Sequence, residues 1–216
     1  MQIETVSRPA GSDPAGRLFG VRDVALLGAA EMRAWDERAI RTLGIGERVL
    51  MERAGTAAAR VVDRLYPTGR VVAAVGAGNN GGDAVVLLRV LRAWGRDVCA
   101  VSVGDAPLPL ELLHGWQIEV APAERAGSVL ATASVVIDGI LGTGARGAPR
   151  PPHAALIEQL TRAGAPVVAL DGPSGVDLTG GTIAGAAVRA EVTVTFGAPK
   201  RGLLLYPGRA HAGRIV

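Results

Sequence analysis

The segment that most constrains the fold is a glycine-rich turn between an apolar run and a helical pattern. The turn covers residues 76–83 and holds the only two asparagines of the chain, Asn79 and Asn80. It follows the β-branched run 71–75, which is typical of a buried strand, and precedes residues 84–91, which have the spacing of a helix with an apolar face. A strand, a glycine-rich turn and a helix in this order predict an open α/β fold that places a ligand at the turn.

The turn also carries more polar groups than a plain phosphate loop requires. Its four glycines allow close approach to a ligand or a positive φ, and the amides at the helix start can hold a phosphate. The carboxamides of Asn79 and Asn80 and the carboxylate of Asp83 add oxygen ligands and hydrogen-bonding groups. We therefore expect a small-molecule site at this turn.

Downstream of the turn, apolar runs alternate with helical patterns. Such alternation implies right-handed crossovers and a sheet covered on both faces. The predicted fold class is therefore α/β, a three-layer α/β/α Rossmann-like sandwich with a mostly parallel central sheet. Strands are expected at residues 71–75, 97–103, 118–120, 135–138, 167–171, 192–196 and 213–216, and helices near 28–43, 47–65, 83–94, 108–116, 122–131 and 153–163.

A length of 216 residues suits one domain with an N-terminal extension. Residues 1–22 are polar and aperiodic and contain no apolar core of signal-peptide length, so we expect a disordered extension there. Residues 23–216 are expected to form the domain. No apolar run approaches the roughly 18 residues of a membrane span, so we expect no membrane association and a cytoplasmic location.

Charge and rare residues narrow the function further. The net charge is +3, but the basic residues are scattered rather than clustered, so no nucleic-acid partner is expected. Cys99 is the single cysteine, which excludes a disulfide within the chain. Lys200 is the only lysine among 23 basic residues. Because an ammonium and a guanidinium are not interchangeable, we expect a functional role for Lys200.

Three further polar loops follow predicted strands, at residues 138–147, 171–177 and 197–202. The carboxyl ends of parallel strands share one edge of the sheet, so all four loops should converge there. Their asparagine, aspartate and serine oxygens predict a polar pocket that suits a hard cation. Asp138 and Asp171 could instead cap turns or helices.

No histidine lies in the four loops, so a serine–histidine–aspartate nucleophile is not expected. Acid–base chemistry would then fall to a carboxylate or to Lys200. Residues 76–81 also match the pattern G-x-G-x-x-G, and Asp105 could be the acidic residue that follows such a motif. A nicotinamide-dependent oxidoreductase is therefore a competing hypothesis, although it accounts for neither the asparagine pair nor the later loops.

The loops in this order resemble the NAD(P)HX epimerase family, also called the YjeF N-terminal domain. The resemblance covers residues 27–216 and implies an enzyme that interconverts the R and S epimers of hydrated NADH and NADPH (NADHX and NADPHX). A separate dehydratase then restores the S form. The motifs that carry the resemblance are Ala30-Glu31-Met32, Met51-Glu52-Arg53-Ala54-Gly55, Asn79-Asn80-Gly81-Gly82-Asp83, residues 138–144, residues 171–175, and Val194-Thr195-Phe196-Gly197-Ala198-Pro199-Lys200.

The resemblance also implies roles for individual residues. Asp171 would be the catalytic acid–base residue. One potassium ion per subunit would be held by Asn80, Asp138 and Ser174. The substrate would be bound by Asn79, Asn80, Gly81, Gly82, Asp83, Gly142, Thr143, Gly144, Ala145, Arg146, Gly147, Ala148, Asp171 and Lys200.

Two positions depart from the family pattern. Arg53 stands where the family usually has asparagine, and Ala84 where it usually has glycine. Ala84 is harmless at a helix start because alanine is a good helix former. The resemblance further implies a homodimer and a functional dehydratase partner, which is fused to this domain in many relatives. A non-catalytic binding or scaffold module of the same fold remains the alternative from another functional class.

Overall fold

The computed structural model describes residues 24–103 and 109–216. The predicted extension at residues 1–22 and Asp105 of the oxidoreductase hypothesis lie outside the described residues. Within the described ranges, no helix is long and apolar enough to cross a membrane.

One seven-stranded sheet forms the centre of the fold, in the order β3-β2-β1-β4-β5-β6-β7. Each neighbouring pair of these strands is parallel, so the predicted mostly parallel sheet is confirmed. The strands expected at 118–120 and 213–216 both form, at the positions of β3 and β7. The strands are β1 Val71–Val75, β2 Val98–Ser102, β3 Glu119–Pro122, β4 Val135–Gly139, β5 Val167–Leu170, β6 Val192–Val194 and β7 Arg214–Ile215.

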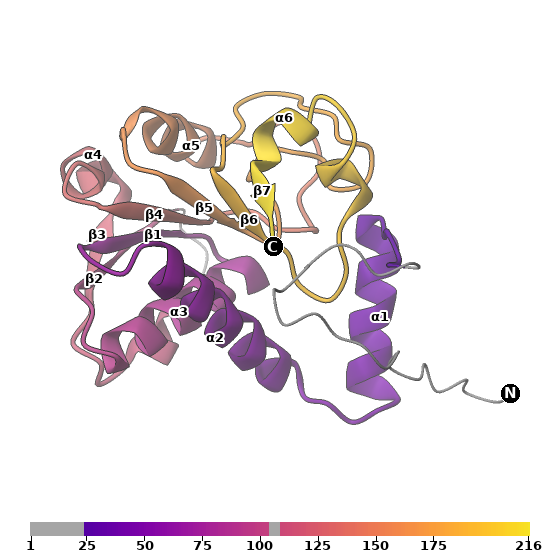
Figure 1. The fold of residues 1–216 in the computed structure, drawn as a ribbon, viewed down its shortest axis with the longest axis horizontal. Coiled ribbons are helices and arrows are strands. Elements are labelled where there is room, and N and C mark those ends of the chain that lie inside the picture. The colour runs from indigo at the N-terminus through magenta and orange to yellow at the C-terminus, as the bar shows by residue number, and fades with distance from the viewer. Residues whose placement is uncertain (1–23, 104–108) are drawn as a thin grey trace, which may run out of the picture.

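Helices cover both faces of the sheet, as the predicted three-layer sandwich requires (Figure 1). The α-helices are α1 Ala29–Arg41, α2 Glu47–Leu65, α3 Asn79–Ala93, α4 Ala126–Leu130, α5 His153–Arg162 and α6 Arg209–Ala212, and the 3-10 helices are η1 Pro109–Leu113, η2 Ala123–Arg125 and η3 Arg201–Leu203.

Two predicted helices are shorter than expected. The segment 108–116 contains the 3-10 helix η1, which ends at Leu113, two residues before the left-handed Gly115. The segment 122–131 begins as η2 and becomes helical only over α4. The first segment connects β2 to β3 and the second connects β3 to β4. The three layers of the sandwich are unchanged.

Alternating side chains of β1 build the two halves of the core. Val71, Ala73 and Val75 pack with residues of α2 and α3, whereas Val72 and Ala74 pack with residues of α4 and α5. All five are fully buried, and each buried valine contributes about 1.5–3 kcal/mol relative to an exposed one. A run of small apolar residues is therefore sufficient to fix β1 at the centre of the sheet.

The strand order reverses at β1, which lies between β2 and β4. The chain runs outward from β1 to β3 and then returns to the other side of β1 at β4. In an open parallel sheet, such a reversal leaves a crevice beyond the carboxyl ends of the two strands, where ligands bind. The turn after β1 and the loop after β4 both lie at this crevice.

Candidate active site

A cavity of about 890 Å³ opens at this crevice. Its walls come from α1, α2, the start of α3 and the segments that follow β4, β5 and β6. Of the four loops predicted to converge, each contributes residues to it. The residues lining the cavity are Met32, Arg33, Asp36, Ile40, Glu47, Leu50, Met51, Arg53, Ala54, Ala57, Ala77, Gly78, Asn79, Asn80, Asp83, Ile140, Leu141, Gly142, Thr143, Gly144, Ala145, His153, Asp171, Thr195, Phe196, Gly197 and Lys200.

The asparagine motif is not a loop, as the sequence suggested, but the first turns of α3, which begins at Asn79. The glycines were expected to allow either close approach or a positive φ, and none of them has a positive φ. Close packing accounts for two of them: a Cβ at Gly81 would lie 1.9 Å from the Gly76 carbonyl oxygen, and one at Gly82 would lie 2.5 Å from Met51 Cε. Gly81 and Gly82 therefore support the wall of the cavity rather than line it.

The start of α3 presents polar groups to the cavity. Asn79 and Asn80 both line it, and Asn79 Nδ2 donates to Glu47 at the start of α2 over 2.8 Å. Since the N-cap residue Gly78 has no side chain to cap this helix end, the first-turn amides are placed to bind an anionic group.

Asn80, Asp138 and Ser174 meet around the backbone of Leu141. Asn80 Nδ2 donates to the Leu141 carbonyl oxygen over 2.9 Å, and the Leu141 amide donates to Ser174 Oγ over 2.9 Å. Ser174 Oγ in turn donates to Asp138 Oδ1 over 2.6 Å. The three residues assigned to a cation site are thus brought together, and all three are buried.

One oxygen of this cluster is left without a partner. Asn80 Oδ1 is buried and accepts no hydrogen bond from the described residues, although an unpaired buried polar atom is costly. The bond from Nδ2 to Leu141 fixes the amide orientation, so the free atom is the oxygen. The amide oxygen of Asn80, the carboxylate of Asp138 and the hydroxyl of Ser174, linked through Leu141, are oxygen donors of the kind that hard cations prefer.

Burial raises the pKa of Asp138 to about 6, against the hydrogen bonds from Ser174 and Ile140 that lower it. The carboxyl is fully enclosed, and among the described residues its charge is balanced by these hydrogen-bond donors alone. A cation beside it would favour its ionised form.

Asp171 and Lys200 form a buried ion pair at the floor of the cavity. Lys200 Nζ donates to Asp171 Oδ1, and the Phe196 amide donates to the same oxygen over 3.3 Å. Both contacts fall on Oδ1, so Oδ2 is the oxygen available to a ligand. Asp171 has a φ of 63°, a left-handed conformation in which aspartate and asparagine are the most tolerated residues after glycine.

Lys200 has no donor left for a substrate. Its other two contacts are to the Phe196 carbonyl oxygen at 2.6 Å and to Thr195 Oγ1 at 3.1 Å, and an ammonium has three donors. The side chain is fully buried. This geometry favours a role in holding Asp171 over the direct substrate contact that the sequence suggested.

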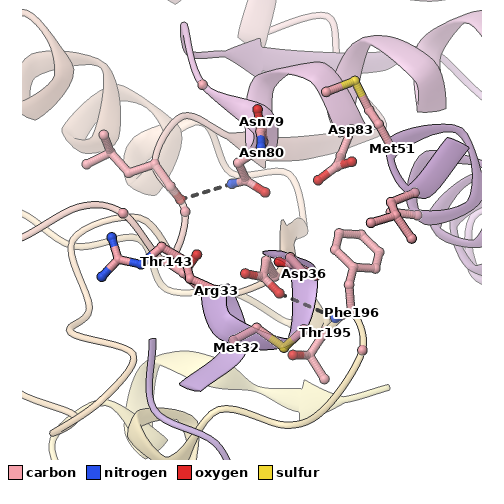
Figure 2. A pocket seen from close by; sticks show the side chains of 18 of the residues that line it. Met32, Arg33, Asp36, Met51, Asn79, Asn80, Asp83, Thr143, Thr195 and Phe196 are labelled. Carbon is pink, nitrogen blue, oxygen red and sulfur yellow. Dashed lines mark hydrogen bonds between the residues drawn. The ribbon is translucent and has the colours of Figure 1, made fainter. Parts of the chain in front are cut away.

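Asp83 lies on a second wall of the cavity, on α3, and is half-buried. Burial, together with the charges of Asp171 and Asp36 and against that of Lys200, raises the pKa of Asp83 to about 8. Figure 2 shows Asp83 and Asp36 directed toward the same space from α3 and α1. The cavity therefore combines carboxyl groups in different surroundings, which is a common arrangement for acid–base chemistry.

The predicted phosphate loop divides between two pockets. Gly142, Thr143, Gly144 and Ala145 line the main cavity, while Arg146 and Gly147 line an adjoining pocket of about 200 Å³. Ala148 lines neither of them. Leu141 and Ala145 border both pockets, so the two spaces lie on either side of this loop.

Sequence reasoning missed the contribution of α1. Arg33 and Asp36 line the cavity beside Met32 but belong to no motif that carries chemistry. The start of α1 is held there by Leu27, which exchanges backbone hydrogen bonds with the Lys200 segment at Pro199 and Arg201. His153, which lies outside the polar loops, also lines the cavity.

Comparison with known proteins identifies similar chains. A family model described as YjeF-related protein N-terminus matches residues 47–202. The NAD(P)H-hydrate epimerase of Limosilactobacillus fermentum is 37% identical over 196 residues, which cover 87% of this chain and 93% of that protein. The bifunctional NAD(P)H-hydrate repair enzyme Nnr of Pyrobaculum aerophilum is 40% identical over 193 residues, which cover 83% of this chain but only 38% of that longer protein. The crystal structure of yeast ynu0 (YNL200c) has a TM-score of 0.75 at 23% identity, covers 83% of each chain and shows the same fold.

Proposed function

This chain belongs to the family of YjeF-related protein N-termini, and we propose that it is an NAD(P)H-hydrate epimerase that interconverts the R and S forms of hydrated NADH and NADPH. The similarity to the epimerase of L. fermentum carries this proposal, because it extends over 93% of that protein. The geometry of the cavity supports it, since one site combines a helix start for phosphate, an oxygen cluster for a cation and separate carboxyl groups for proton transfer.

In this proposal the nucleotide phosphates lie between the start of α3 and the loop after β4. Asn79 and Asn80 would hold them from the helix, and Gly142–Ala145, the part of the loop that lines this cavity, from the other side. Arg33 and Arg53 line the same cavity and supply positive charge. The arginine at position 53 would thus act on the nucleotide, in place of the asparagine that the family usually has.

The hydrated nicotinamide ring would lie against Met32 and Phe196, which are apolar residues of the cavity lining (Figure 2). The Phe196 amide contacts Asp171. Asp171 Oδ2 would exchange a proton with the ring hydroxyl as the catalytic base. Lys200 would keep Oδ1 engaged and so fix the direction of Oδ2.

Asn80, Asp138 and Ser174 would hold one potassium ion per subunit. When bound, the ion would supply positive charge near the diphosphate and hold the loop at Leu141 against α3. The unpaired Asn80 Oδ1 supports this assignment.

Potassium dependence tests the cation site directly. In Asn80→Ala, we expect the midpoint of potassium activation to rise about tenfold or more, because a buried oxygen ligand is lost. Rates would be measured while potassium replaces sodium at constant ionic strength. Asn79→Ala is the matched carboxamide control and should change KM but not the potassium midpoint. An unchanged midpoint in Asn80→Ala would remove Asn80 from the cation site.

The function itself is tested by chromatography of purified R-NADHX incubated with and without the protein. We expect the S epimer to appear faster with the protein, and faster in potassium than in sodium. A folded protein that is stabilised by NADPH or ADP-ribose but does not accelerate epimerisation would favour the non-catalytic binding module. Hydride transfer from intact NADPH to an added carbonyl compound would favour the oxidoreductase.

We also propose that the chain forms a homodimer in the cytoplasm and hands its product to a NAD(P)HX dehydratase. Exposed apolar side chains on α1, α2 and the turn between them support a subunit contact, namely Trp35, Leu43, Ile45 and Val49. Sedimentation of the purified protein would test this contact, because a monomer at micromolar concentration would contradict it. The P. aerophilum relative is named a bifunctional NAD(P)H-hydrate repair enzyme, which supports the functional partnership.

A further inference from the structure

We propose that Asp83 is the proton donor of the epimerisation and acts on the substrate from a different wall of the cavity than Asp171. The inference rests on the proposed epimerase function and goes beyond it, because the family resemblance gives Asp83 only a contact with the substrate. It assigns the two halves of acid–base catalysis to two named carboxyl groups.

The position of Asp83 is the first reason. It lies at the inner end of the Asn79–Asp83 motif, where the first turns of α3 face the cavity. Met51 lies beside it and Phe196 lies nearby, and both are apolar (Figure 2). Among the described residues none donates a hydrogen bond to its carboxyl group, so that the group is free to act on a ligand.

The distribution of charge is the second reason. Asp171 has Lys200 as its counter-ion, whereas Asp83 forms no ion pair within the described ranges. Two carboxylates that face one partly desolvated space repel each other, so the one without a counter-ion retains a proton. The pKa of Asp83, raised to about 8 mainly by burial, agrees with this assignment. Asp83 is thus the acid and Asp171 the base at neutral pH.

Inversion by ring opening uses such a pair. Hydration of the reduced ring places a hydroxyl on the carbon beside the ring nitrogen, and inversion there requires one bond of that carbon to break. Asp171 takes the proton of the hydroxyl, and a carbonyl forms at that carbon. The carbon–nitrogen bond breaks at the same time. The electron pair of that bond passes to the nitrogen, which takes the proton of Asp83. After rotation, the nitrogen attacks the other face of the carbonyl and returns its proton to Asp83, while the oxygen regains a proton from Asp171. Atoms and charges balance, and both carboxyl groups are restored.

This assignment predicts the direction of the pH dependence. The acid must carry its proton, so the rate should fall as the pH rises through about 8, where Asp83 ionises. Several other charged or titratable groups face the same cavity from each surrounding element, so the source of this change must be tested by substitution. These groups are Arg33 and Asp36 on α1, Glu47 and Arg53 on α2, His153 on α5, and Asp171 and Lys200 after β5 and β6.

The test compares wild type with Asp83→Asn, which keeps the shape of the side chain and removes the acid. We expect kcat for R-NADHX to fall about a hundredfold or more, KM to change far less, and the loss of rate above about pH 8 to disappear. Asp97→Asn is the control, because Asp97 is 69% exposed, lies outside the cavity lining and forms a 3.7 Å ion pair with Arg70. Its kcat and pH profile should match those of wild type.

Thermal unfolding gives a readout that does not depend on activity. The pKa of Asp83 is about 8 in the folded chain and near 3.8 when unfolded, so its ionisation destabilises the folded state increasingly between those pH values. The melting temperature of Asp83→Asn relative to wild type should therefore rise with pH over this range. A difference that is constant with pH would contradict the assignment.

Three kinetic outcomes would overturn the proposal. A normal kcat with a raised KM would make Asp83 a binding residue only. If the rate of Asp83→Asn still falls above about pH 8, the pH dependence belongs to another titratable group. If Asp83→Asn does not fold, the pH–rate profile of wild type is the test, and a rate that does not fall above about pH 8 would contradict the proposal. An inactive wild type would overturn the epimerase function as well, whereas an active wild type with an equally active variant would overturn only the role of Asp83.

Discussion

Replacing Asp171 by asparagine is expected to lower the epimerisation rate about a thousandfold while the chain still folds. General acid–base groups contribute about 10²–10⁴ in rate, and a carboxamide cannot exchange the proton. Asparagine is the suitable substitution because the backbone has a φ of 63° at this residue. Alanine would add the cost of a left-handed conformation, about 1–2 kcal/mol, and so confuse strain with catalysis.

The measurement is kcat on purified R-NADHX, with binding of ADP-ribose followed in parallel. Binding should be retained within about tenfold, because the phosphate-binding groups lie on α3 and the loop after β4. Asp63→Asn is the control: Asp63 pairs with Arg96 away from the cavity and its loss should leave kcat unchanged. A near-normal rate in Asp171→Asn would remove Asp171 from the mechanism and leave the site as a binding pocket.

Much of the fold is predictable because the strands are runs of small β-branched residues between polar loops. Val71–Val75 is buried on both faces of the sheet. Such a continuous apolar run predicts a strand of a parallel sheet independently of the residues that follow it. The start of α3 is not predictable in this way. The segment from Asn79 to Gly82 disfavours a helix, since each glycine costs about 1 kcal/mol relative to alanine. Packing of Gly81 on Gly76 and of Gly82 on Met51 overrides that preference.

The convergence of the site was also predictable, because parallel strands place their following loops at one edge. Asp138 and Ser174 are 36 residues apart in sequence, and Asp171 and Lys200 are 29 apart, yet each pair is hydrogen-bonded. The part played by α1 was not predictable. It depends on long-range contacts such as that of Met32 with Gly197, which local sequence patterns do not predict. Nor could the sequence say that every donor of Lys200 is already used.

Because all three donors of Lys200 are engaged, its loss should strongly reduce the stability of the folded chain. Lys200→Met would leave Asp171 without its counter-ion, in a position where its side chain is only 13% exposed. Breaking a buried pair by removing one partner costs about 3–5 kcal/mol. Lys200→Arg should also destabilise, because a planar guanidinium cannot replace a fully enclosed ammonium with three converging acceptors. Denaturant unfolding would measure both effects.

The double variant Lys200→Met with Asp171→Asn separates the ion pair from general packing. With both charges gone, no uncompensated carboxylate remains, so the double variant should lose less stability than the sum of the two single variants. Arg201→Met is the matched control, since the 3.5 Å pair between Arg201 and Glu31 is about half exposed and is worth under about 1 kcal/mol. Additive losses in the double variant would mean that Lys200 stabilises the floor of the cavity by its packing. In that case the orientation of Asp171 must depend on the Phe196 amide and on its own backbone.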